Sequence, residues 1–457
     1  MRGVRIIRNA VLITGGIVVL AFLCLDRIDR REIIDTDAFR STFAELALPD
    51  QYQVVYGRIE AGWSRRHIVP DAPLRLAGYG FSGKFNGVHD SLYVRVIAVR
   101  SREAEAFIIS ADLLMFPREL ARCVEREVSL RYGTNAACYF TASHTHKGYG
   151  NWDPSPAGQI ILGKYREELV TWLCERIMDA LEEARAGYQY ASIGYRKSDA
   201  KAWALNRIDP TAPADGWLRG IEITCEDGKK ALLLSFAAHP VNIGDPYPAL
   251  SNDYAAYLIS ALEGQSLADM AVFAAGMVGS HNAPRGDARD YGRAEWIAEG
   301  LLRSYVKGIP SPAMDTAAII FQQVSVFLHD PQLRLAPGIR LRPWLFELLF
   351  GKPEAYIRAL RIGDVLMLGM PCDFSGEIAV LDGFDAYAKK RGLNLFITSF
   401  NGAYIGYITA DHHYDKSRHE EVMAMNWVGP GMGHYFSAVI AALIDRHSPP
   451  LSGPGHD

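Results

Sequence analysis

The sequence predicts an α/β (α+β) fold: a large single domain with central mixed β-sheets flanked by helices. The chain of 457 residues is 49% hydrophobic and 22% charged, which is typical of a globular protein and excludes the disordered, collagen-like and coiled-coil classes. Segments with strand-like and helix-like apolar spacing follow one another along most of its length. No internal repeat and no low-complexity linker divides the sequence, so we expect one domain rather than several.

The first 31 residues are predicted to form a signal anchor. Arg2, Arg5 and Arg8 precede an apolar run over residues 10–25, and a charged segment follows abruptly. No cleavage site with small residues follows the run. We therefore expect an uncleaved membrane anchor, with the arginines inside the cell and the body exported to the periplasmic or extracellular side. The alternative is a buried N-terminal helix, although three arginines would then flank it.

The other domain limits follow from the same patterns. Residues 32–57 are predicted to form a connecting helix or stalk, because residues 35–48 have amphipathic helical spacing. Residues 58–447 are predicted to form the main domain, and residues 448–457 a flexible tail.

Local patterns predict the elements of the main domain in order. Runs rich in apolar and β-branched residues predict strands at residues 92–99, 106–110, 138–142, 231–237, 270–275, 365–370 and 395–399. Apolar residues at helical spacing predict helices at residues 117–132, 165–186, 254–262, 293–307, 378–390 and 435–445. The apolar segment 337–350 is predicted to be a core or lid segment rather than a membrane contact.

Charge and cysteine usage exclude several further classes. The chain has 48 basic and 52 acidic residues, so it lacks the positive charge that a nucleic-acid partner requires. No phosphate-binding glycine motif follows a predicted strand. One of the six cysteines, Cys24, lies in the apolar run; the other five are odd in number and have no CxxC spacing. We therefore expect neither a disulfide framework nor a cysteine-built zinc site, and most cysteines should be small core residues.

Five predicted strands are followed by side chains that can bind metals or take part in catalysis. In chain order, these side chains are His144 and His146, then His239, then Ser280, His281 and Asn282, then Asp373, and finally Tyr407. In α/β folds the loops beyond one edge of the sheet converge. The sequence therefore predicts one shared site at the strand ends.

Two histidine loops and one carboxylate loop match the nitrogen and oxygen ligands of a catalytic zinc ion. Each member also has an ordinary alternative: a hydrogen-bonded pair for His144 and His146, a structural role for His239, a helix N-cap for Asp373 and a core position for Tyr407. Together they favour a metal site. Zinc there would polarise a carbonyl group and lower the pKa of bound water to about 7.

A second metal site made of His281, His412 and His413 is a further possibility in the sequence. The sequence favours the alternative, that these are exposed loop histidines.

The same residues resemble motifs of the neutral/alkaline (non-lysosomal) ceramidases, zinc amidases that cleave the N-acyl bond of ceramide. The resemblance extends from about residue 60 to residue 414 and implies the N-terminal catalytic domain of that family for residues 58–447. The motifs that carry it are Leu76-Ala77-Gly78-Tyr79-Gly80, Gly87-Val88-His89-Asp90, His144-Thr145-His146, Asn206-Arg207, Phe236-Ala237-Ala238-His239-Pro240, Pro371-Cys372-Asp373-Phe374-Ser375 and Ala403-Tyr404-Ile405-Gly406-Tyr407-Ile408-Thr409.

The resemblance implies a role for each matched position. The ligands of one zinc ion per chain would be His144, His239, Asp373 and Tyr407. His146 would lie next to the ligands or act as the acid/base group. Arg207 would bind substrate oxygens and support the charge of the transition state.

Three positions depart from the family pattern. Asp373 stands where the family has a glutamate ligand. In the loop that supplies the proposed nucleophile of the family, Asn282 occupies the serine position and Ser280 lies two positions earlier. His419 replaces a second tyrosine, and we expect no counterpart of the family's C-terminal β-sandwich within these 457 residues.

We therefore expect a membrane-anchored zinc-dependent amide hydrolase that acts on ceramide or a related lipid-like N-acyl substrate by metal-activated water, without a serine intermediate. One alternative is the same site acting on a non-lipid amide. The other is a binding protein that has kept the fold and lost catalysis.

Overall fold

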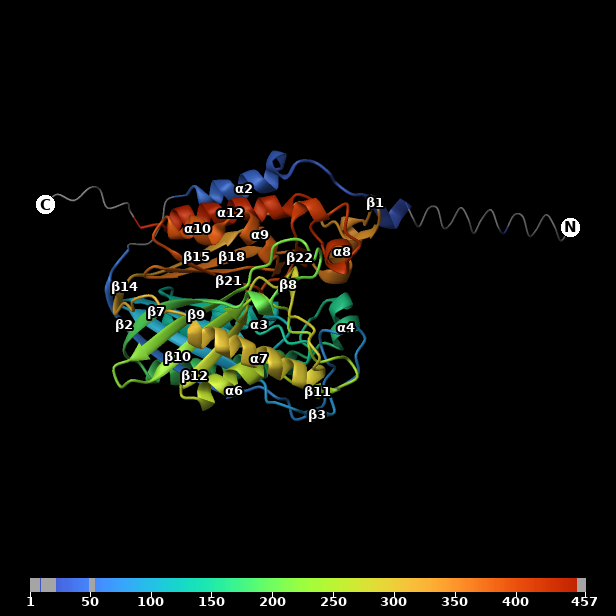
Figure 1. The fold of residues 1–457 in the computed structure, drawn as a ribbon. Coiled ribbons are helices and arrows are strands. Elements are labelled where there is room, and N and C mark those ends of the chain that lie inside the picture. Colours follow the sequence, from blue (N-terminus) through green and yellow to red (C-terminus); the bar gives the residue numbers. More distant parts are fainter. Residues whose placement is uncertain (1–8, 10–21, 49–53, 450–457) are drawn as a thin grey trace.

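The computed structural model describes residues 9, 22–48 and 54–449. Figure 1 shows how the helices and strands are arranged in space. Most of the chain is built from one topological unit that occurs three times. Each unit has three antiparallel strands, then helix, then a fourth strand that pairs parallel with the third, then a closing helix.

The three units follow one another along the chain. The first consists of β2 (Gly57–His67), β4 (Tyr93–Ser101), β5 (Ala104–Ala111), α3 (Arg118–Tyr132), β6 (Ala136–Ala142) and α5 (Glu167–Ala186). The second consists of β7 (Gln189–Asp199), β9 (Trp217–Cys225), β10 (Lys230–Phe236), α6 (Asp253–Gly264), β12 (Met270–Ala275) and α7 (Asp290–Lys307). The third consists of β15 (Ile319–Ser325), β18 (Tyr356–Ile362), β19 (Val365–Gly369), α9 (Gly376–Leu381), α10 (Phe384–Lys389), β21 (Asn394–Thr398) and α12 (Met432–His447).

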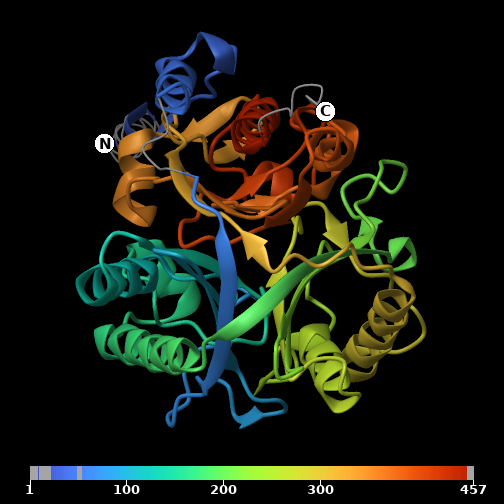
Figure 2. The ribbon, with the colours of Figure 1, turned by 90° about the vertical axis from the view of Figure 1, so that its left-hand side faces the viewer.

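The strands form two stacked sheets. Pairing of β2 with β7 joins the first two units into a nine-stranded mixed sheet of order β12-β10-β9-β7-β2-β4-β5-β6, with β14 (Thr316–Ala317) added beside β2. The third unit forms a four-stranded sheet of order β15-β18-β19-β21. In Figure 2 the helices of the three units form three separate groups around the two sheets.

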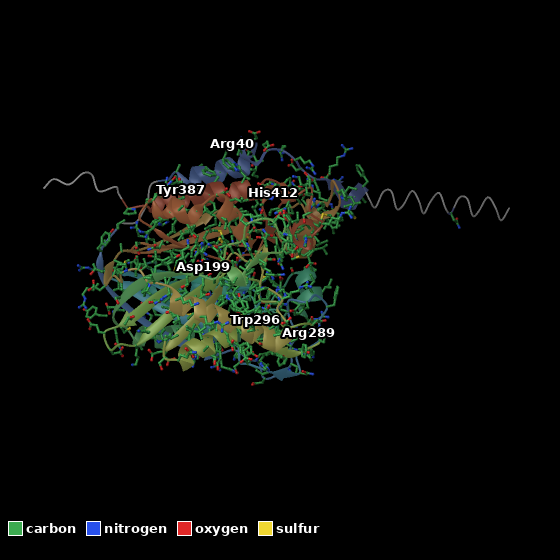
Figure 3. The ribbon with its side chains drawn as sticks, in the orientation of Figure 1. Arg40, Asp199, Arg289, Trp296, Tyr387 and His412 are labelled. Carbon is green, nitrogen blue, oxygen red and sulfur yellow. A yellow bond between two sulfur atoms is a disulfide. The ribbon has the colours of Figure 1, made fainter. Side chains whose placement is uncertain are left out.

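Apolar side chains hold these layers together. Ile97, Ile193 and Leu233 of the large sheet pack with Leu360 and Phe396 of the small sheet in one buried cluster. Three further clusters lie between each group of helices and its sheet. Figure 3 shows side chains filling the space between the layers. The resulting helix–sheet–sheet–helix stack is the α/β fold that the sequence predicts.

Shorter elements lie at one end of the molecule. They are β1 (Leu25–Arg27), β16 (Arg334–Ala336) and β17 (Ile339–Leu341), which form a small sheet, and the helices α4 (Pro156–Leu162) and α8 (Pro343–Phe350). The helix predicted near residues 35–48 is α2 (Asp37–Leu46), which packs against the body: the hydroxyls of Thr42 and Tyr435 lie 2.6 Å apart.

Most predicted elements are confirmed, but two expectations about them are wrong. The helix predicted at residues 378–390 is divided into α9 and α10, because Gly383 has a left-handed backbone (φ 65°). The expectation of no internal repeat is wrong, because the topological unit occurs three times. The sequence did not reveal it, because the three copies share no sequence pattern. The pattern also did not identify β2, β7, β9, β15 and β18. The segment 337–350 forms β17 and α8; Phe346 is buried, whereas Trp344 and Leu348 are exposed.

The prediction that the cysteines are unpaired is wrong for one pair. Cys123 of α3 and Cys174 of α5 form a disulfide that closes a sequence separation of 51 residues. The two helices pack side by side on the large sheet, and only this packing brings the two sulfur atoms together. Cys138, Cys225 and Cys372 are buried free thiols, as expected.

The predicted signal anchor lies mostly outside the residues that the structure describes. Within the described part of the chain, no helix combines the length and the apolar character needed to cross a bilayer. Residues 450–457 of the predicted tail also lie outside the described residues.

Candidate metal centre at the strand ends

Each unit sends the loops after its third and fourth strands to one common place. The parallel pairs β5–β6, β10–β12 and β19–β21 end at the same edge of their sheets. Short bridges then tie the loops together: β8 (Leu205–Asn206) pairs with β13 (His281–Asn282), and β20 (Asp373–Phe374) pairs with β22 (Tyr407–Ile408). The convergence predicted from the strand ends is therefore observed.

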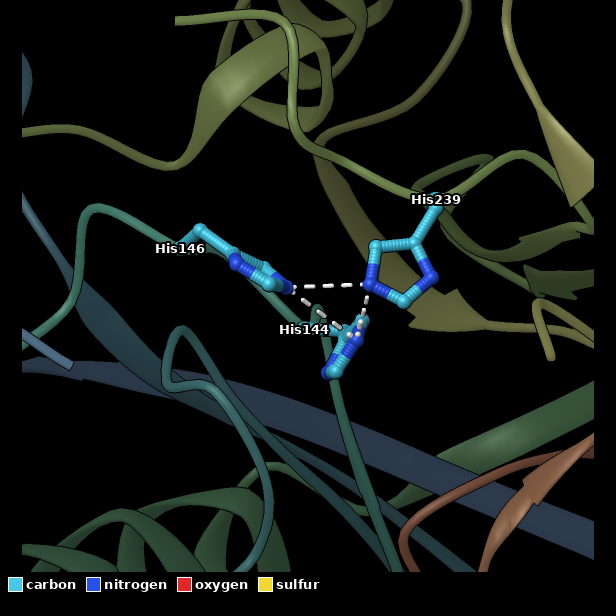
Figure 4. Close-up of side chains that lie close together, drawn as sticks. All are labelled: His144, His146 and His239. Atoms are coloured by element: carbon cyan, nitrogen blue, oxygen red, sulfur yellow. Dashed lines mark hydrogen bonds between the residues drawn. The ribbon is translucent and has the colours of Figure 1, made fainter. Parts of the chain in front are cut away.

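Three imidazole rings face one another at the centre of these loops (Figure 4). The Nε2 atom of His144 lies 2.8 Å from Nε2 of His239, and Nε2 of His146 lies 3.0 Å from Nε2 of His239 and 3.4 Å from Nε2 of His144. Ligand atoms about 2.1 Å from a shared zinc ion in a tetrahedron stand about 3.4 Å apart. The three nitrogen atoms therefore have spacings close to those of metal ligands.

The opposite nitrogen of each ring fixes its orientation. His144 donates through Nδ1 to the carbonyl oxygen of Leu114, and His146 donates through Nδ1 to the carbonyl oxygen of Gly78 at 2.9 Å. Both contacts place the hydrogen on Nδ1, which leaves the Nε2 lone pair free for a cation. This is the usual arrangement of histidine ligands in metal sites.

His239 has contacts that favour opposite tautomers. Its Nδ1 lies 3.5 Å from the carbonyl oxygen of Val278, which can only accept, and 3.4 Å from Nη2 of Arg207, which can only donate. With the hydrogen on Nδ1, the ring donates to Val278 and its Nε2 lone pair is free for a cation. The ring therefore fits a metal ligand.

Burial keeps the three rings neutral. Desolvation lowers the pKa of His144 and of His239 well below the usual histidine value, and it lowers the pKa of His146 to about 3. Neutral imidazole is the form that binds metals.

Asp373 contributes an oxygen atom beside the rings. Its Oδ1 lies 3.4 Å from Nε2 of His144 and is buried without a hydrogen-bond partner, whereas Oδ2 accepts from the hydroxyl of Tyr404 at 2.7 Å. Burial raises the pKa of this carboxyl to about 7, against the opposing effect of the Tyr404 hydrogen bond. A buried carboxylate oxygen with no partner is costly, and a shared cation would satisfy it.

Arg207 and Tyr407 lie on a second side of the cluster. Nη2 of Arg207 donates to the Tyr407 hydroxyl at 3.3 Å, and Nη1 donates to Oδ1 of Asn282 at 3.4 Å. Nε of Arg207 lies 3.0 Å from Oε1 of the buried Glu421. Burial and the neighbouring Asp373 raise the pKa of Tyr407 well above its ordinary value. His146, Arg207 and Asn282 are partly exposed and so form the side that a substrate can approach.

Two predicted catalytic positions lie apart from the histidines. The Oγ of Ser280 is buried and contacts Oγ of Ser375 at 2.6 Å and Nδ1 of His281 at 3.3 Å. His419 is half exposed at the start of α11 (Glu420–Met423), with Nδ1 3.8 Å from Oε2 of Glu421.

The structure also contains site residues that the sequence reasoning missed. Tyr404 and Glu421 are both absent from the predicted set, although each stands within three residues of a predicted position. The expectation that His281, His412 and His413 are exposed loop histidines is wrong for His281 and His413, which are buried. The possible second site also differs in one member. His281 is buried elsewhere, where its Nε2 accepts from the backbone N–H of Asp215, and the residue that joins His412 and His413 is Glu377.

Comparisons with solved structures identify the fold. No model of a known protein family matches the sequence, and a search of curated proteins finds no match. A crystal structure of neutral ceramidase from Pseudomonas aeruginosa superposes with a TM-score of 0.71 at 16% sequence identity, over 89% of this chain and 77% of that one. A structure described as ceramidase complexed with C2 also gives 0.71 at 16% identity, over 88% of this chain and 77% of that one. The resemblance read from the sequence motifs thus extends to the architecture, and the chain has the neutral ceramidase fold.

Proposed function

We propose that this protein is a zinc-dependent amide hydrolase that cleaves the N-acyl bond of ceramide or of a related lipid-like amide. The observation that carries the proposal is that the Nε2 atoms of His144, His146 and His239 lie within 3.4 Å of one another. The unpartnered Oδ1 of Asp373 lies 3.4 Å from Nε2 of His144. The similarity of fold to neutral ceramidases supports the substrate class.

We assign the zinc ligands to His144, His239, Asp373 and Tyr407, for one ion at this centre. When bound, the ion supplies Lewis acidity toward the scissile carbonyl group and toward the attacking water. His146 is the partly exposed member of the three histidines, and we assign it to proton transfer between water and the leaving amine.

Two donors, the guanidinium of Arg207 and the hydroxyl of Tyr407, are positioned for the negative charge that develops on the carbonyl oxygen. The guanidinium of Arg207 contacts Tyr407 and Asn282, and the ion pair with Glu421 orients it. Because these groups are fixed before the substrate binds, they stabilise the charged state without reorganising.

Direct attack by water, with no serine intermediate, fits the position of Ser280. Its hydroxyl is buried against Ser375, and the partly exposed residue of that loop is Asn282, which has no nucleophilic atom. The loop therefore supplies a hydrogen-bonding amide to the site.

An exposed apolar face supports a membrane substrate. Trp344 and Leu348 of α8 and Ile160 of α4 are each more than half exposed, and α4 lies beside α8 at the end of the molecule where β1 enters the fold (Figure 1). The Trp344 ring N–H donates to the carbonyl oxygen of Leu23. Residues 22–25, the described end of the apolar run, therefore contact the body at this face. We propose that the run anchors the exported protein and that the face rests on the bilayer.

The test combines metal content with amidase activity on the full chain in detergent micelles. Wild-type protein should contain zinc and hydrolyse ceramide, and His144→Ala and His239→Ala should each remove this zinc and the activity. His146→Ala should keep the zinc and lose activity on the order of a thousandfold. Loss of zinc from His146→Ala would make that residue a ligand instead.

Other results point to the alternative functions. Bound zinc with activity on N-acyl amino acids but none on ceramide would indicate a non-lipid amidase. Ceramide binding without hydrolysis would indicate a binding protein.

A further inference from the structure

A second group of potential metal ligands lies outside the site described above. Glu377 of α9 faces His412 and His413 of the short helix η3 (Asp411–His413), and one ligand atom from each lies within 4.8 Å of the others. Oε1 of Glu377 lies 3.2 Å from Nε2 of His412, and Oε2 lies 2.9 Å from Nε2 of His413. We propose that these three side chains bind a second divalent transition-metal ion of the zinc class.

The group combines a fixed carboxylate with an accessible side. Glu377 is fully buried, and its Oε2 accepts a hydrogen bond from the side-chain amide of Asn206 at 2.8 Å. His413 is buried, whereas the side chain of His412 is 50% exposed. Figure 3 shows His412 on the side of the molecule that also carries Arg40 and Tyr387. A metal ion can therefore enter from solvent.

A simple buried ion pair explains this arrangement less well. One carboxylate needs only one hydrogen-bonded imidazole partner, and His413 already provides it. His412 has access to water, yet its Nε2 is turned toward the same carboxylate, and the two ring centroids are 4.0 Å apart. Both Nε2 atoms thus face one carboxylate, which is the arrangement that a shared cation requires.

The donor set indicates the class of metal. Two imidazole nitrogens and one carboxylate oxygen suit zinc, cobalt and similar ions, whereas calcium and magnesium require mostly oxygen ligands. Three protein ligands leave at least one position for water on the exposed side.

This second site joins three segments that also form the first site. Helix α9 begins three residues after Asp373, η3 lies shortly after Tyr407, and Asn206 immediately precedes Arg207. A metal ion held by Glu377, His412 and His413 would clamp these segments together. We assign it a structural role, and its existence does not depend on the proposed amidase activity.

The test is a metal count on the full chain in detergent. Protein stripped with a chelator and dialysed is titrated with Co²⁺, followed by absorption and by elemental analysis. Wild type should bind two equivalents. His144→Ala should bind one, His412→Ala should bind one, and the double variant none. His434→Ala is the matched control and should bind two equivalents. His434 is an exposed histidine of α12 that lies beside η3, since its backbone N–H donates to Oδ2 of Asp411.

Each outcome separates the two sites. His412→Ala replaces an exposed side chain, so loss of its equivalent does not reflect misfolding, which circular dichroism checks independently. A different result would be that wild type binds only one equivalent, which is lost in His412→Ala and kept in His144→Ala. That result supports the second site and shows that the histidine cluster of the proposed amidase binds no metal. Equal cobalt content in wild type and His412→Ala overturns the inference.

Discussion

The imidazoles of the first site face one another because neighbouring backbone holds each ring. His144 has a left-handed backbone (φ 63°), which is strained for a residue other than glycine, and its ring stacks on Phe400 at 4.2 Å. Gly78 approaches so closely that an added Cβ would lie 2.7 Å from His146, and its φ of 109° suits glycine alone. Strain and close approach of this kind are typical of functional sites.

Ser280→Ala tests whether the nearby serine is a nucleophile. We expect activity to stay within about threefold of wild type, because the serine hydroxyl contacts Ser375 and no histidine of the cluster. The measurement is steady-state ceramide hydrolysis, with His146→Ala as the inactive control. A fall on the order of a thousandfold would show that Ser280 takes part in the chemistry.

Asp373→Asn tests the raised carboxyl pKa in metal-free protein. The folded pKa of about 7 lies above the unfolded value of about 3.9. Between these values the folded state keeps a proton that the unfolded state has lost. The free energy of unfolding of wild type therefore falls as pH rises, by up to about 4 kcal/mol.

Asparagine has no such proton, so the stability of Asp373→Asn relative to wild type should increase from about pH 4 to about pH 7. Urea unfolding in the presence of chelator measures both values, and a difference independent of pH would contradict the assignment.

At the scale of elements, very short strand pairs set the register of the site loops. Pairing of β20 with β22 places Asp373 opposite Tyr407, and pairing of β8 with β13 places Asn206 opposite His281. Pairs of two residues contribute little stability by themselves. Their register depends on the long strands that precede them.

The disulfide between α3 and α5 gives a prediction for the first unit. Cys123→Ser combined with Cys174→Ser should lower the free energy of unfolding by about 4 kcal/mol, the loop-closure value for the observed sequence separation. Urea unfolding measures the loss. Counting thiols in denatured, unreduced protein is the control: four free cysteines are expected, and six would show that the bond does not form.

The exposed apolar helix α8 gives a prediction for membrane contact. Trp344→Ser with Leu348→Ser should weaken binding to neutral phosphatidylcholine vesicles at least about tenfold, because each side chain loses apolar area that the bilayer would bury. Leu130→Ser is the matched control, since Leu130 is 75% exposed on α3, away from this face. Vesicle flotation measures the binding. If the double variant and Leu130→Ser weaken it equally, this face is not the membrane contact.

At the scale of the whole molecule, the site exists where three repeated units meet. Each unit supplies residues of the candidate site, so no unit holds the complete set. His144 and His146 follow β6, His239 follows β10, and Asp373 and Tyr407 follow β19 and β21. The packing of the small sheet on the large one sets the distance of Asp373 from the histidines. A change that weakens the interface between the two sheets should therefore also weaken metal binding.

Phe396→Ala tests this coupling. Phe396 of β21 is fully buried between the sheets, and its removal should cost about 3–5 kcal/mol and weaken cobalt binding at the histidine site. Leu258→Ala in α6 removes a buried side chain on the outer face of the large sheet and serves as the control. It should lower the melting temperature with a smaller effect on metal affinity. Equal metal affinity in wild type and Phe396→Ala would contradict the coupling.

The sequence by itself determined the local features of this protein. Apolar spacing identified most of the helices and the strands that end at the site, because these patterns depend on neighbours along the chain. The motifs around His144, His239, Asp373 and Tyr407 resembled those of neutral ceramidases and so indicated that fold, because each motif consists of residues that are neighbours along the chain. The edge of the sheet where these residues meet followed from the rule for parallel strands.

Only the tertiary structure decided which distant residues touch. It placed His146 at the same distance as the predicted ligands, joined Glu377 rather than His281 to His412 and His413, and paired Cys123 with Cys174. It also revealed a repeated unit that shares topology without shared sequence. Contacts between residues far apart in the chain depend on how layers pack, and the spacing of residues along one sequence does not record that packing.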